Sequence, residues 1–109
     1  MKMIIAIVQD DDEQALGEAF MQADIKATKL SSTGGFLRAG NTTFLVGCRE
    51  CDVDRILAII KDSSQERQQV VATPTSFDID YGMAQSFPTE VAVGGAIVFV
   101  LPVDEFHRF

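Results

Sequence analysis

The 109-residue chain is poor in the residues from which metal sites, disulfide frameworks and nucleic-acid surfaces are built. It holds two cysteines and one histidine, too few for a disulfide scaffold or a four-ligand zinc site. Nine basic residues against sixteen acidic ones leave a net charge of −7. This balance disfavours binding to DNA, RNA or anionic lipid, because these partners are held by clustered Lys and Arg. A small anionic ligand stays compatible with it, since a few bases and backbone N–H groups make a local positive pocket.

The chain also lacks an apolar run long enough to span a membrane as a helix. Its longest run, residues 91–103, has 13 residues and contains two glycines and a proline, whereas a membrane-spanning helix needs about 20 apolar residues. The start, MKMIIAIVQDDDE, lacks a small-residue cleavage site and is typical of a first strand rather than of a signal peptide. We therefore expect one soluble, cytoplasmic domain over residues 1–109, with no membrane partner.

What the chain does contain is a clear order of periodic segments. Apolar and alternating runs predict strands, and apolar residues at helical spacing predict helices. The predicted strands are 3–8, 25–32, 42–48 and 90–103, and the predicted helices are 12–23 and 52–63. Strand, helix, strand, strand, helix, strand is the order of ferredoxin-like domains, an α+β fold with four antiparallel strands and both helices on one face.

Polar residues at the helix starts and in the connections complete this prediction. The acidic run 10–13 suits a solvated helix start, and Asp52 is placed to cap the second helix. Residues 63–89 are predicted to be irregular apart from a strand fragment at 70–73, and a segment of this length is typical of a functional or mobile loop. The tail, 104–109, has room for about one helical turn.

The last predicted strand is apolar on both sides. Ile97, Phe99 and Leu101 point one way, and Val98 and Val100 point the other. Helices cover only one face of such a sheet, so the second apolar face must be buried by something else. Other copies of the same chain are the simplest cover, and the sequence therefore predicts self-assembly.

A glycine-rich segment, STGGFLRAGN, lies between the second and third predicted strands. Its glycines let a ligand approach the main chain, and its N–H groups can cradle an anion. Phe36 is suited to stack on a heterocyclic base, with Leu37 beside it, and the amide of Asn41 matches an adenine edge. Lys26, Lys29 and Arg38 are candidate cations for binding phosphates. The alternative is a flexible hairpin tip whose Phe36 packs on its own subunit.

Other features carry weaker signals. Gly94-Gly95 marks either a bulge, with a close approach of backbone or ligand, or a packing requirement at a subunit contact. Cys48 and Cys51 have the C-x-x-C spacing of redox and zinc motifs, but no second pair or nearby histidine completes a site. His107 is interpreted as a surface residue. No nucleophile–base pair is visible, so neither catalytic residues nor a metal site are predicted.

Three blocks of the sequence resemble a known family. The opening MKMIIAIVQD, the central ATKLSSTGGFLRAGNTTFLVG and the final VAVGGAIVFVLPVDEFHRF are similar to the cyclic di-AMP receptors of the PII-like superfamily, the PstA or DarA family. The similarity spans nearly the whole chain apart from residues 63–86. It implies a homotrimer of ferredoxin-like subunits that binds cyclic di-AMP in three clefts between neighbours, without enzymatic activity or a cofactor. The glycine-rich loop would be the short loop of this family, and residues 63–89 would hold the long one.

The resemblance also implies which residues bind the ligand. Phe36 and Leu37 would pack around adenine, Asn41 and the backbone at Gly47 would contact a base edge, and Phe99 would wall the cleft. Thr28 and Gly35 would lie near the ligand's backbone. The residues that match the family pattern by position are Thr28, Gly35, Phe36, Leu37, Asn41, Gly47 and Phe99.

The chain departs from that pattern at three positions. Asp24, Lys26 and Arg108 stand where the family carries Asn, Arg and Gln. Lys26 keeps a charge for a phosphate but lacks the planar fork of arginine. Asp24 adds a negative charge, and Arg108 compensates if the tail reaches a neighbour's cleft. We therefore expect Lys26 and Arg108 to contribute to the site, with somewhat weaker binding.

Other functions remain as alternatives at the level of the sequence. A PII-like regulator that senses ATP or another adenine nucleotide would use the same cleft. An acylphosphatase-like enzyme is the contrasting class, but the glycine and arginine pattern of that family is missing near the N-terminus. A purely structural subunit is the third. The sequence does not identify the downstream protein partner.

Overall fold

In a computed structural model, the structure describes residues 1–32, 40–74 and 86–109. The chain begins with β1 (Lys2–Gln9), α1 (Asp10–Gln22), β2 (Thr28–Ser32) and β3 (Asn41–Cys48). A 3₁₀ turn, η1 (Glu50–Asp52), then leads into α2 (Val53–Ser64). The remaining elements are β4 (Arg67–Pro74), β5 (Ser86–Val93) and β6 (Ala96–Pro102). None of the helices in these described ranges is long and apolar enough to cross a membrane.

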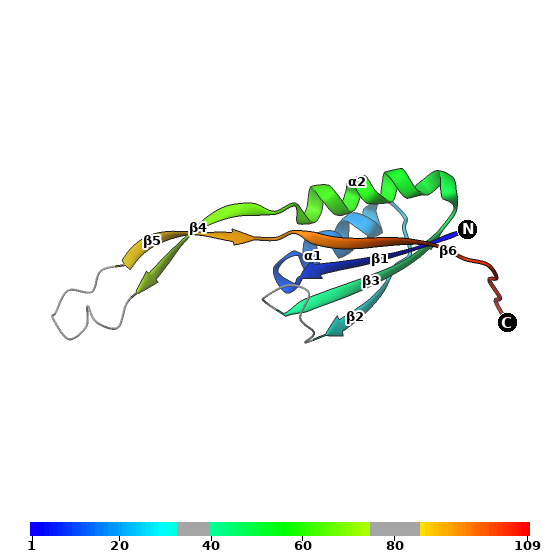
Figure 1. Cartoon of the computed structure of the whole chain (residues 1–109), viewed down its shortest axis with the longest axis horizontal. Helices are drawn as coiled ribbons and strands as arrows, with labels where there is room; N and C mark the ends of the chain where they lie inside the picture. Colours follow the sequence, from blue (N-terminus) through cyan, green and yellow to red (C-terminus); the bar gives the residue numbers. More distant parts are fainter. Residues whose placement is uncertain (33–39, 75–85) are drawn as a thin grey trace.

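Four of the strands form one antiparallel sheet in the order β2-β3-β1-β6. Helices α1 and α2 lie on one face of this sheet, as Figure 1 shows. The ferredoxin-like α+β fold predicted from the sequence is therefore confirmed, and each helix and each of the first three strands lies within about three residues of its predicted bounds.

The hydrophobic core lies between the helices and the sheet. Ile4, Ala6 and Val8 alternate along β1 and are fully buried, because every second side chain of a strand points to the same face. The rings of Phe20 on α1 and Phe44 on β3 meet edge to face, with centroids 5.6 Å apart. The rest of the core comes from the same two layers: Leu16, Val46, Cys48, Ile56 and Ile60.

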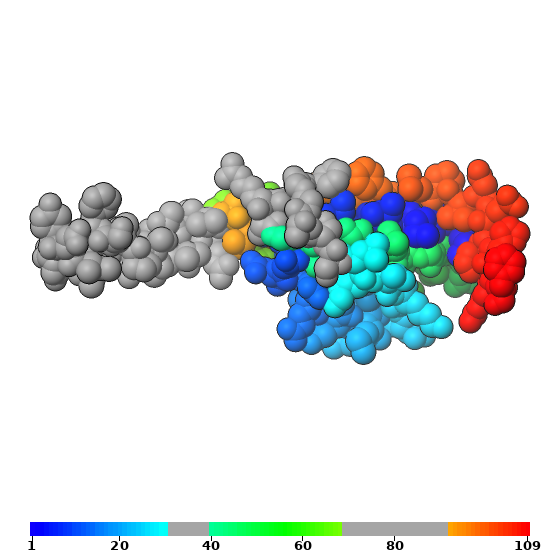
Figure 2. All heavy atoms as spheres, turned by 90° about the horizontal axis from the view of Figure 1, so that it is seen from below, coloured from blue at the N-terminus to red at the C-terminus, as the bar shows by residue number. Residues whose placement is uncertain are grey.

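The opposite face of the sheet carries apolar side chains without a helix over them in the described part of the chain. The register places Ile5 opposite Leu45 on one side and opposite Phe99 on the other. Phe99 and Leu101 are 43% and 44% exposed. Figure 2 shows β6, β1, β3 and β2 side by side on this face. The predicted two-sided apolar character of the last strand is thus confirmed for β6.

The predictions for residues 63–89 and 90–103 are wrong in one respect. Two strands, β4 and β5, pair with each other as an antiparallel ribbon that projects from the four-stranded body, and we call this ribbon the arm. The predicted single last strand is divided at Gly94 and Gly95, whose φ angles are +83° and +94°. The chain turns from β5 into β6 through this left-handed backbone conformation, which residues other than glycine rarely adopt.

Polar contacts hold the root of the arm on the body. The Arg67 guanidinium donates Nη2–H to Asp12 Oδ1 at 2.9 Å, and this hydrogen bond raises the pKa of Arg67. The Gly94 N–H donates to Gln9 Oε1 at 2.7 Å, and the Gly95 N–H donates to the Ser64 carbonyl. A Cβ atom on Gly94 would lie only 2.6 Å from Arg67 Nη1, so the close approach predicted at this glycine pair is confirmed.

The first turn of α1 is solvated only in part: Asp10 and Asp11 are exposed, as the acidic run suggested, but Asp12 is not. Asp12 is 2% exposed because Arg67 and the arm root cover it. Asp10 accepts a hydrogen bond from the Thr42 hydroxyl at 2.8 Å. Glu13 pairs with Lys29, and the hydrogen bond from this lysine lowers the pKa of Glu13. Three of the four acidic residues therefore connect α1 to the sheet and the arm.

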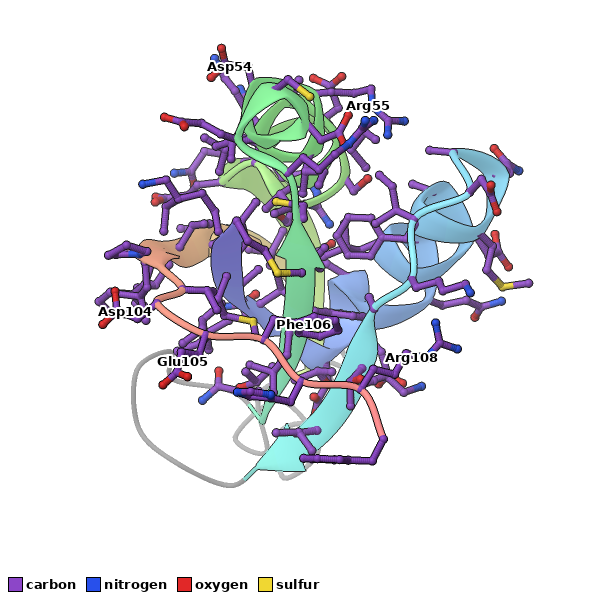
Figure 3. All side chains as sticks on the ribbon, turned by 90° about the vertical axis from the view of Figure 1, so that its right-hand side faces the viewer. Asp54, Arg55, Asp104, Glu105, Phe106 and Arg108 are labelled. Atoms are coloured by element: carbon purple, nitrogen blue, oxygen red, sulfur yellow. The ribbon has the colours of Figure 1, made fainter. Side chains whose placement is uncertain are left out.

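Two smaller predictions also need correction. Asp52 makes no side-chain cap at the start of α2; its carboxylate instead faces Arg49 at 3.3 Å and Arg55 at 3.7 Å. The tail after β6 forms no helical turn over residues 103–109. Figure 3 shows it crossing the end of the sheet, with Asp104 on the β6 side and Arg108 on the β2 side.

Candidate ligand-binding site

A pocket of about 400 Å³ opens at the end of the sheet where β1 begins and β3 ends. Its volume lies within the range of about 300–1,000 Å³ that is typical of small-molecule sites. It is lined from four parts of the chain: the start of β1, the entry to β2, the end of β3 and the C-terminal tail. The lining residues are Met1, Met3, Lys26, Ala27, Thr28, Leu45, Gly47, Val103 and Phe106.

Strand pairing explains the apolar side of the pocket. Met3 lies opposite Gly47 in the register of β1 and β3, and Leu45 lies opposite Thr28 in that of β3 and β2. Gly47 has no side chain to fill the space in front of its main chain. A Cβ atom there would lie 3.6 Å from Met1 Cε, an ordinary contact. The glycine therefore keeps the pocket open without being required by the packing.

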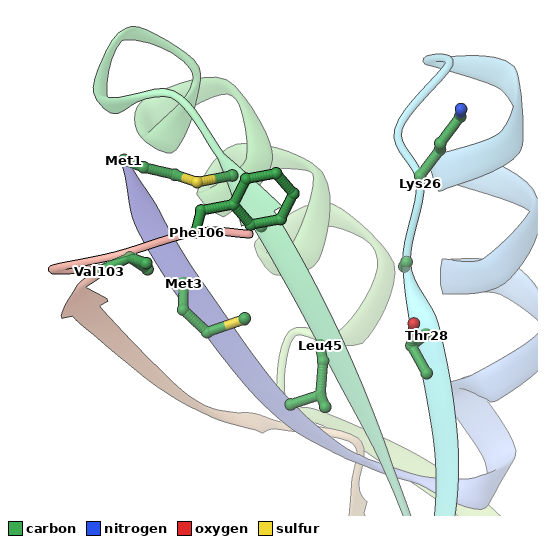
Figure 4. A pocket seen from close by; sticks show the side chains of 9 residues that line it. Met1, Met3, Lys26, Thr28, Leu45, Val103 and Phe106 are labelled. Carbon is green, nitrogen blue, oxygen red and sulfur yellow. The ribbon is translucent and has the colours of Figure 1, made fainter. Parts of the chain in front are cut away.

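The polar side of the pocket comes from the chain that leads into β2. Lys26 and Thr28 are exposed, and both line the pocket across from β1 and β3 (Figure 4). A lysine ammonium attracts an anion, and a threonine hydroxyl both donates and accepts hydrogen bonds. The pocket thus combines an apolar floor with a positive charge, which suits a flat apolar group that carries a phosphate.

The tail closes the pocket at the end of the sheet. The Val103 N–H donates to the Met1 carbonyl at 3.1 Å, and this bond continues the pairing of β6 with β1 by one more contact. Phe106 follows three residues later and lies near the end of β3, beside Met1 (Figures 3 and 4). Sequence reasoning missed Phe106. The available signal was an aromatic residue directly after the acidic pair Asp104 and Glu105 of the tail.

No group of three or more His, Cys, Asp and Glu side chains in the described ranges is arranged to hold a metal ion. Among the groups that line this pocket, the Lys26 ammonium, the Thr28 hydroxyl and backbone N–H groups are suited to contact an anion.

The whole chain, residues 1–109, matches the sequence model of the cyclic-di-AMP receptor family. The chain belongs to this family. It is also similar to a solved structure from Pediococcus pentosaceus ATCC 25745, described as that of a functionally unknown protein. The two are 46% identical, with a TM-score of 0.79, and the match covers 99% of this chain and 96% of that chain.

Three of the residues that match the family's ligand pattern, or replace one of its members, meet at the pocket. These are Lys26, Thr28 and Gly47. Phe99 lies on the same face of the sheet but pairs with Ile5, farther along β1, and does not line this pocket. Asn41 is buried at the other end of β3 from Gly47.

Gly35, Phe36 and Leu37 lie outside the described residues, as does Arg38. Arg108 is exposed on the tail and is not among the lining residues. Of the predicted ligand residues that the structure describes, Lys26, Thr28 and Gly47 are therefore the ones that line this pocket.

Lys29, a further candidate for phosphate binding, points elsewhere. It pairs with Phe44 in the sheet register, so its side chain lies on the helix-covered face. Its ammonium contacts the Glu13 carboxylate there. Lys29 therefore does not line the pocket that Lys26 borders: its neighbour in β2, Thr28, lines that pocket, and adjacent strand residues point to opposite faces.

Asp24, which stands where the family carries Asn, lies close to the main pocket. Asp24 and Lys26 both line an adjoining pocket of about 330 Å³, which also borders Gly47. Asp24 has a positive φ of 57° at the turn after α1. Arg49, Asp52 and Arg55 line the same space, so cations and two acids face it together. The negative charge introduced at this position thus lies next to the main pocket.

The C-x-x-C pair is not joined. Both cysteines are free thiols, with Cys48 buried and Cys51 exposed. Burial raises the pKa of the Cys48 thiol, and the nearby Asp52 raises it further. A raised pKa keeps the thiol protonated, whereas redox and metal chemistry need the thiolate. The surroundings of Cys48 therefore do not favour a redox or metal-binding role for this thiol.

Proposed function

We propose that this protein is a non-enzymatic signal-transduction protein that binds cyclic di-AMP in clefts between the subunits of a homotrimer. The observation that supports this most is the meeting of Lys26, Thr28 and Gly47 at one pocket that opens onto the uncovered face of the sheet. Thr28 and Gly47 match the family's ligand pattern, and Lys26 replaces one of its members. Thr28 lies in β2, Gly47 lies in β3, and Lys26 lies in the segment before β2.

The chemistry of the pocket suits one half of the ligand. An adenine would enter over Leu45 and Met3 and present its polar edge to the main chain at Gly47. Lys26 would attract the phosphate that joins this half to the other. Gly35, Phe36 and Leu37 are proposed to pack around adenine, as the family pattern implies; Asn41 lies at the other end of β3 from Gly47, so its proposed contact is with another part of the ligand or with a neighbour's ligand. The pocket alone supplies a floor and one charge, so further residues have to complete the site.

The neighbouring subunits would supply the remaining residues. Phe99 and Leu101 are more than two-fifths exposed on the uncovered face of the sheet, and apolar side chains in such a patch favour burial against another chain. A second copy docked here would place its own Phe99 and Arg108 beside the pocket. The site would then be shared, and ligand binding would stabilise the assembly through mass action.

A route from the ligand to the arm is available through the first turn of α1. The Asp10 N–H donates to the Gly40 carbonyl at 2.9 Å, at the point where the glycine-rich segment ends. Two residues later, Asp12 holds Arg67 at the root of the arm. We propose that ordering of the glycine-rich segment on ligand binding shifts this turn and thereby the arm, which a downstream protein would contact.

Calorimetry with the purified protein tests the proposal. The panel is cyclic di-AMP, ATP and AMP, and light scattering on the same samples gives the number of subunits. We expect saturable binding of cyclic di-AMP with one site per chain, and a mass of three chains. Absence of binding at tens of micromolar would contradict the proposal. Tighter binding of ATP than of cyclic di-AMP would favour the adenine-nucleotide sensor instead.

A charge variant sharpens the test. Lys26→Met removes the ammonium from the pocket and is expected to raise the Kd for cyclic di-AMP about 5- to 20-fold, since charge-assisted contacts contribute about 1–2 kcal/mol. Lys61→Met is the matched control, because Lys61 is exposed on α2 and does not line this pocket. Equal effects of the two variants would show that only the overall charge matters and would remove Lys26 from the site.

A further inference from the structure

We propose that Phe106 is a ligand-binding residue of this pocket and that its ring supplies a stacking surface for a purine base. The inference rests on the proposed function and adds to it a residue outside the predicted ligand set. It also gives the C-terminal tail a role, since residues 103–109 would hold this ring at the mouth of the pocket.

The tail positions Phe106 by a backbone contact rather than by core packing. The Val103 N–H bonds the Met1 carbonyl, which fixes the start of the tail across the end of β1. From there the tail crosses the sheet toward β2, and Phe106 faces the end of β3 (Figure 3). The ring is thus brought to the pocket by the chain's path.

Phe106 lines the pocket and yet keeps much of its ring exposed. The residue is 64% exposed although it lines a pocket of about 400 Å³. The exposed part of this ring is available to a planar partner entering the pocket. A flat heterocycle would cover that face and exclude water from it.

The rest of the pocket matches a purine more closely than an aliphatic group. Leu45 and Met3 form an apolar floor, and Gly47 exposes main-chain groups that can bond a base edge. Lys26 and Thr28 stand on the opposite side from the tail (Figure 4), where a sugar phosphate attached to the base would extend. An aliphatic ligand would make no contact that uses these polar groups.

Phe109 gives a matched comparison within the same tail. It is fully exposed, its ring stacks on His107 with centroids 6.0 Å apart, and it does not line the pocket. Removal of either ring takes the same apolar area from the tail. Only removal of Phe106 takes a wall from the pocket.

The test is calorimetric titration of the full chain and its variants with cyclic di-AMP. Phe106→Ala is expected to raise the Kd between about 5-fold and 100-fold, the range that corresponds to loss of one base–aromatic stack. Phe106→Tyr should stay within about 3-fold of the unchanged protein, because a phenol keeps the stacking face. Phe109→Ala should stay within about 2-fold. Phe106→Leu, which keeps apolar area without a flat ring, should lie between the Tyr and Ala variants.

The controls separate this inference from the proposed function. Far-UV circular dichroism and light scattering on each variant check that the fold and the number of subunits are unchanged. If the unchanged protein binds and Phe106→Ala binds equally well, the inference is wrong and the proposed function stands. If Phe106→Ala and Phe109→Ala weaken binding equally, the stacking role is likewise wrong. If the unchanged protein does not bind cyclic di-AMP, the proposed function fails and the inference fails with it.

Discussion

The four-stranded body and the two-stranded arm differ in what holds their strands in place. In the body, β1 buries Ile4, Ala6 and Val8 completely beneath α1 and α2. In the arm, β4 and β5 pair with each other, and polar groups at the root attach them to the body, chiefly Arg67 on Asp12 and the Gly94 N–H on Gln9. A two-stranded ribbon by itself is only marginally stable in water.

This difference means that the two regions respond to different kinds of change. Loss of apolar area lowers the stability of the body, because burial of apolar surface is its main source of stability. Loss of one polar contact at the root is expected to free the arm while the body stays folded. Such a division suits a protein in which a rigid body holds a ligand and the position of a second segment reports it.

The largest effect is expected from the body's core. Phe20→Ala should lower the free energy of unfolding by about 3–5 kcal/mol, because it removes a buried ring and leaves a cavity beside Phe44. Urea unfolding followed by circular dichroism, at fixed protein concentration, measures this loss. Met21→Ala is the control, since Met21 is 80% exposed on the same helix, and its effect should stay within about 0.5 kcal/mol. A loss below about 1 kcal/mol for Phe20→Ala would contradict this account of the body.

A smaller effect is expected at the turn between the arm and the body. Gly94→Ala should cost about 2 kcal/mol, because φ is +83° and the added Cβ would lie 2.8 Å from the Gln65 carbonyl oxygen. Hydrogen exchange should become faster in β4 and β5 than in β1. Gly17→Ala is the control: a Cβ there meets no atom within 4 Å, and the change should stabilise α1 by about 0.5–1 kcal/mol. Unchanged exchange in the arm of Gly94→Ala would show that this turn does not position it.

The ion pair at the root of the arm gives the next effect. Arg67→Ala leaves the carboxylate of Asp12 buried without its cation; since Arg67 is about half exposed, water reduces the cost to about 1–2 kcal/mol. The double variant Asp12→Ala/Arg67→Ala should cost less than Arg67→Ala alone, because it removes the stranded charge as well. Both variants should speed hydrogen exchange in the arm more than in the body. Arg55→Ala, which breaks an exposed pair with Asp52, is the control and should leave the arm unchanged.

The smallest effect concerns pH and a polar contact within the body. Lys29 lowers the pKa of Glu13, so this pair stabilises the folded state at pH values above the ordinary glutamate pKa of about 4.3. The stabilisation is lost as the pH falls through the lowered pKa of the folded state. In Lys29→Met the free energy of unfolding should therefore fall less steeply as the pH drops from about 5 to about 3. These pH limits hold to within about one pH unit. An unchanged decline in this variant, or the same change in Lys61→Met, would contradict the assignment.

The ferredoxin-like body was predictable because its signals are local. Apolar residues at helical spacing placed the second helix at 52–63, and the structure has it at Val53–Ser64. The arm was not predictable in the same way. Its strands, RQQVVATP and SFPTEVAV, mix polar residues and prolines without a repeating pattern, and they pair with each other although residues 75–85 separate them in the sequence.

The residues of the candidate site also differ in how far the sequence could predict them. Lys26, Thr28 and Gly47 were found because they belong to a family pattern that is written in consecutive residues. Phe106 was missed, because its place in the pocket depends on the path of the tail over the end of the sheet. The face of the sheet on which Lys29 lies was not predictable for a related reason. The sequence shows a charge near the site but does not show which face of the sheet that charge is on.

The sequence by itself determined the order of the elements of the body, the α+β class and the family, since hydrophobic periodicity and consecutive motifs involve residues close together in the chain. Only the tertiary structure decided that Arg67 covers Asp12, 55 residues away, and that Phe106 lies beside Met1. Such contacts depend on how the strands pair and where the ends of the chain meet. The geometry of strand pairing, and not the local pattern, therefore brings the site and the arm root together.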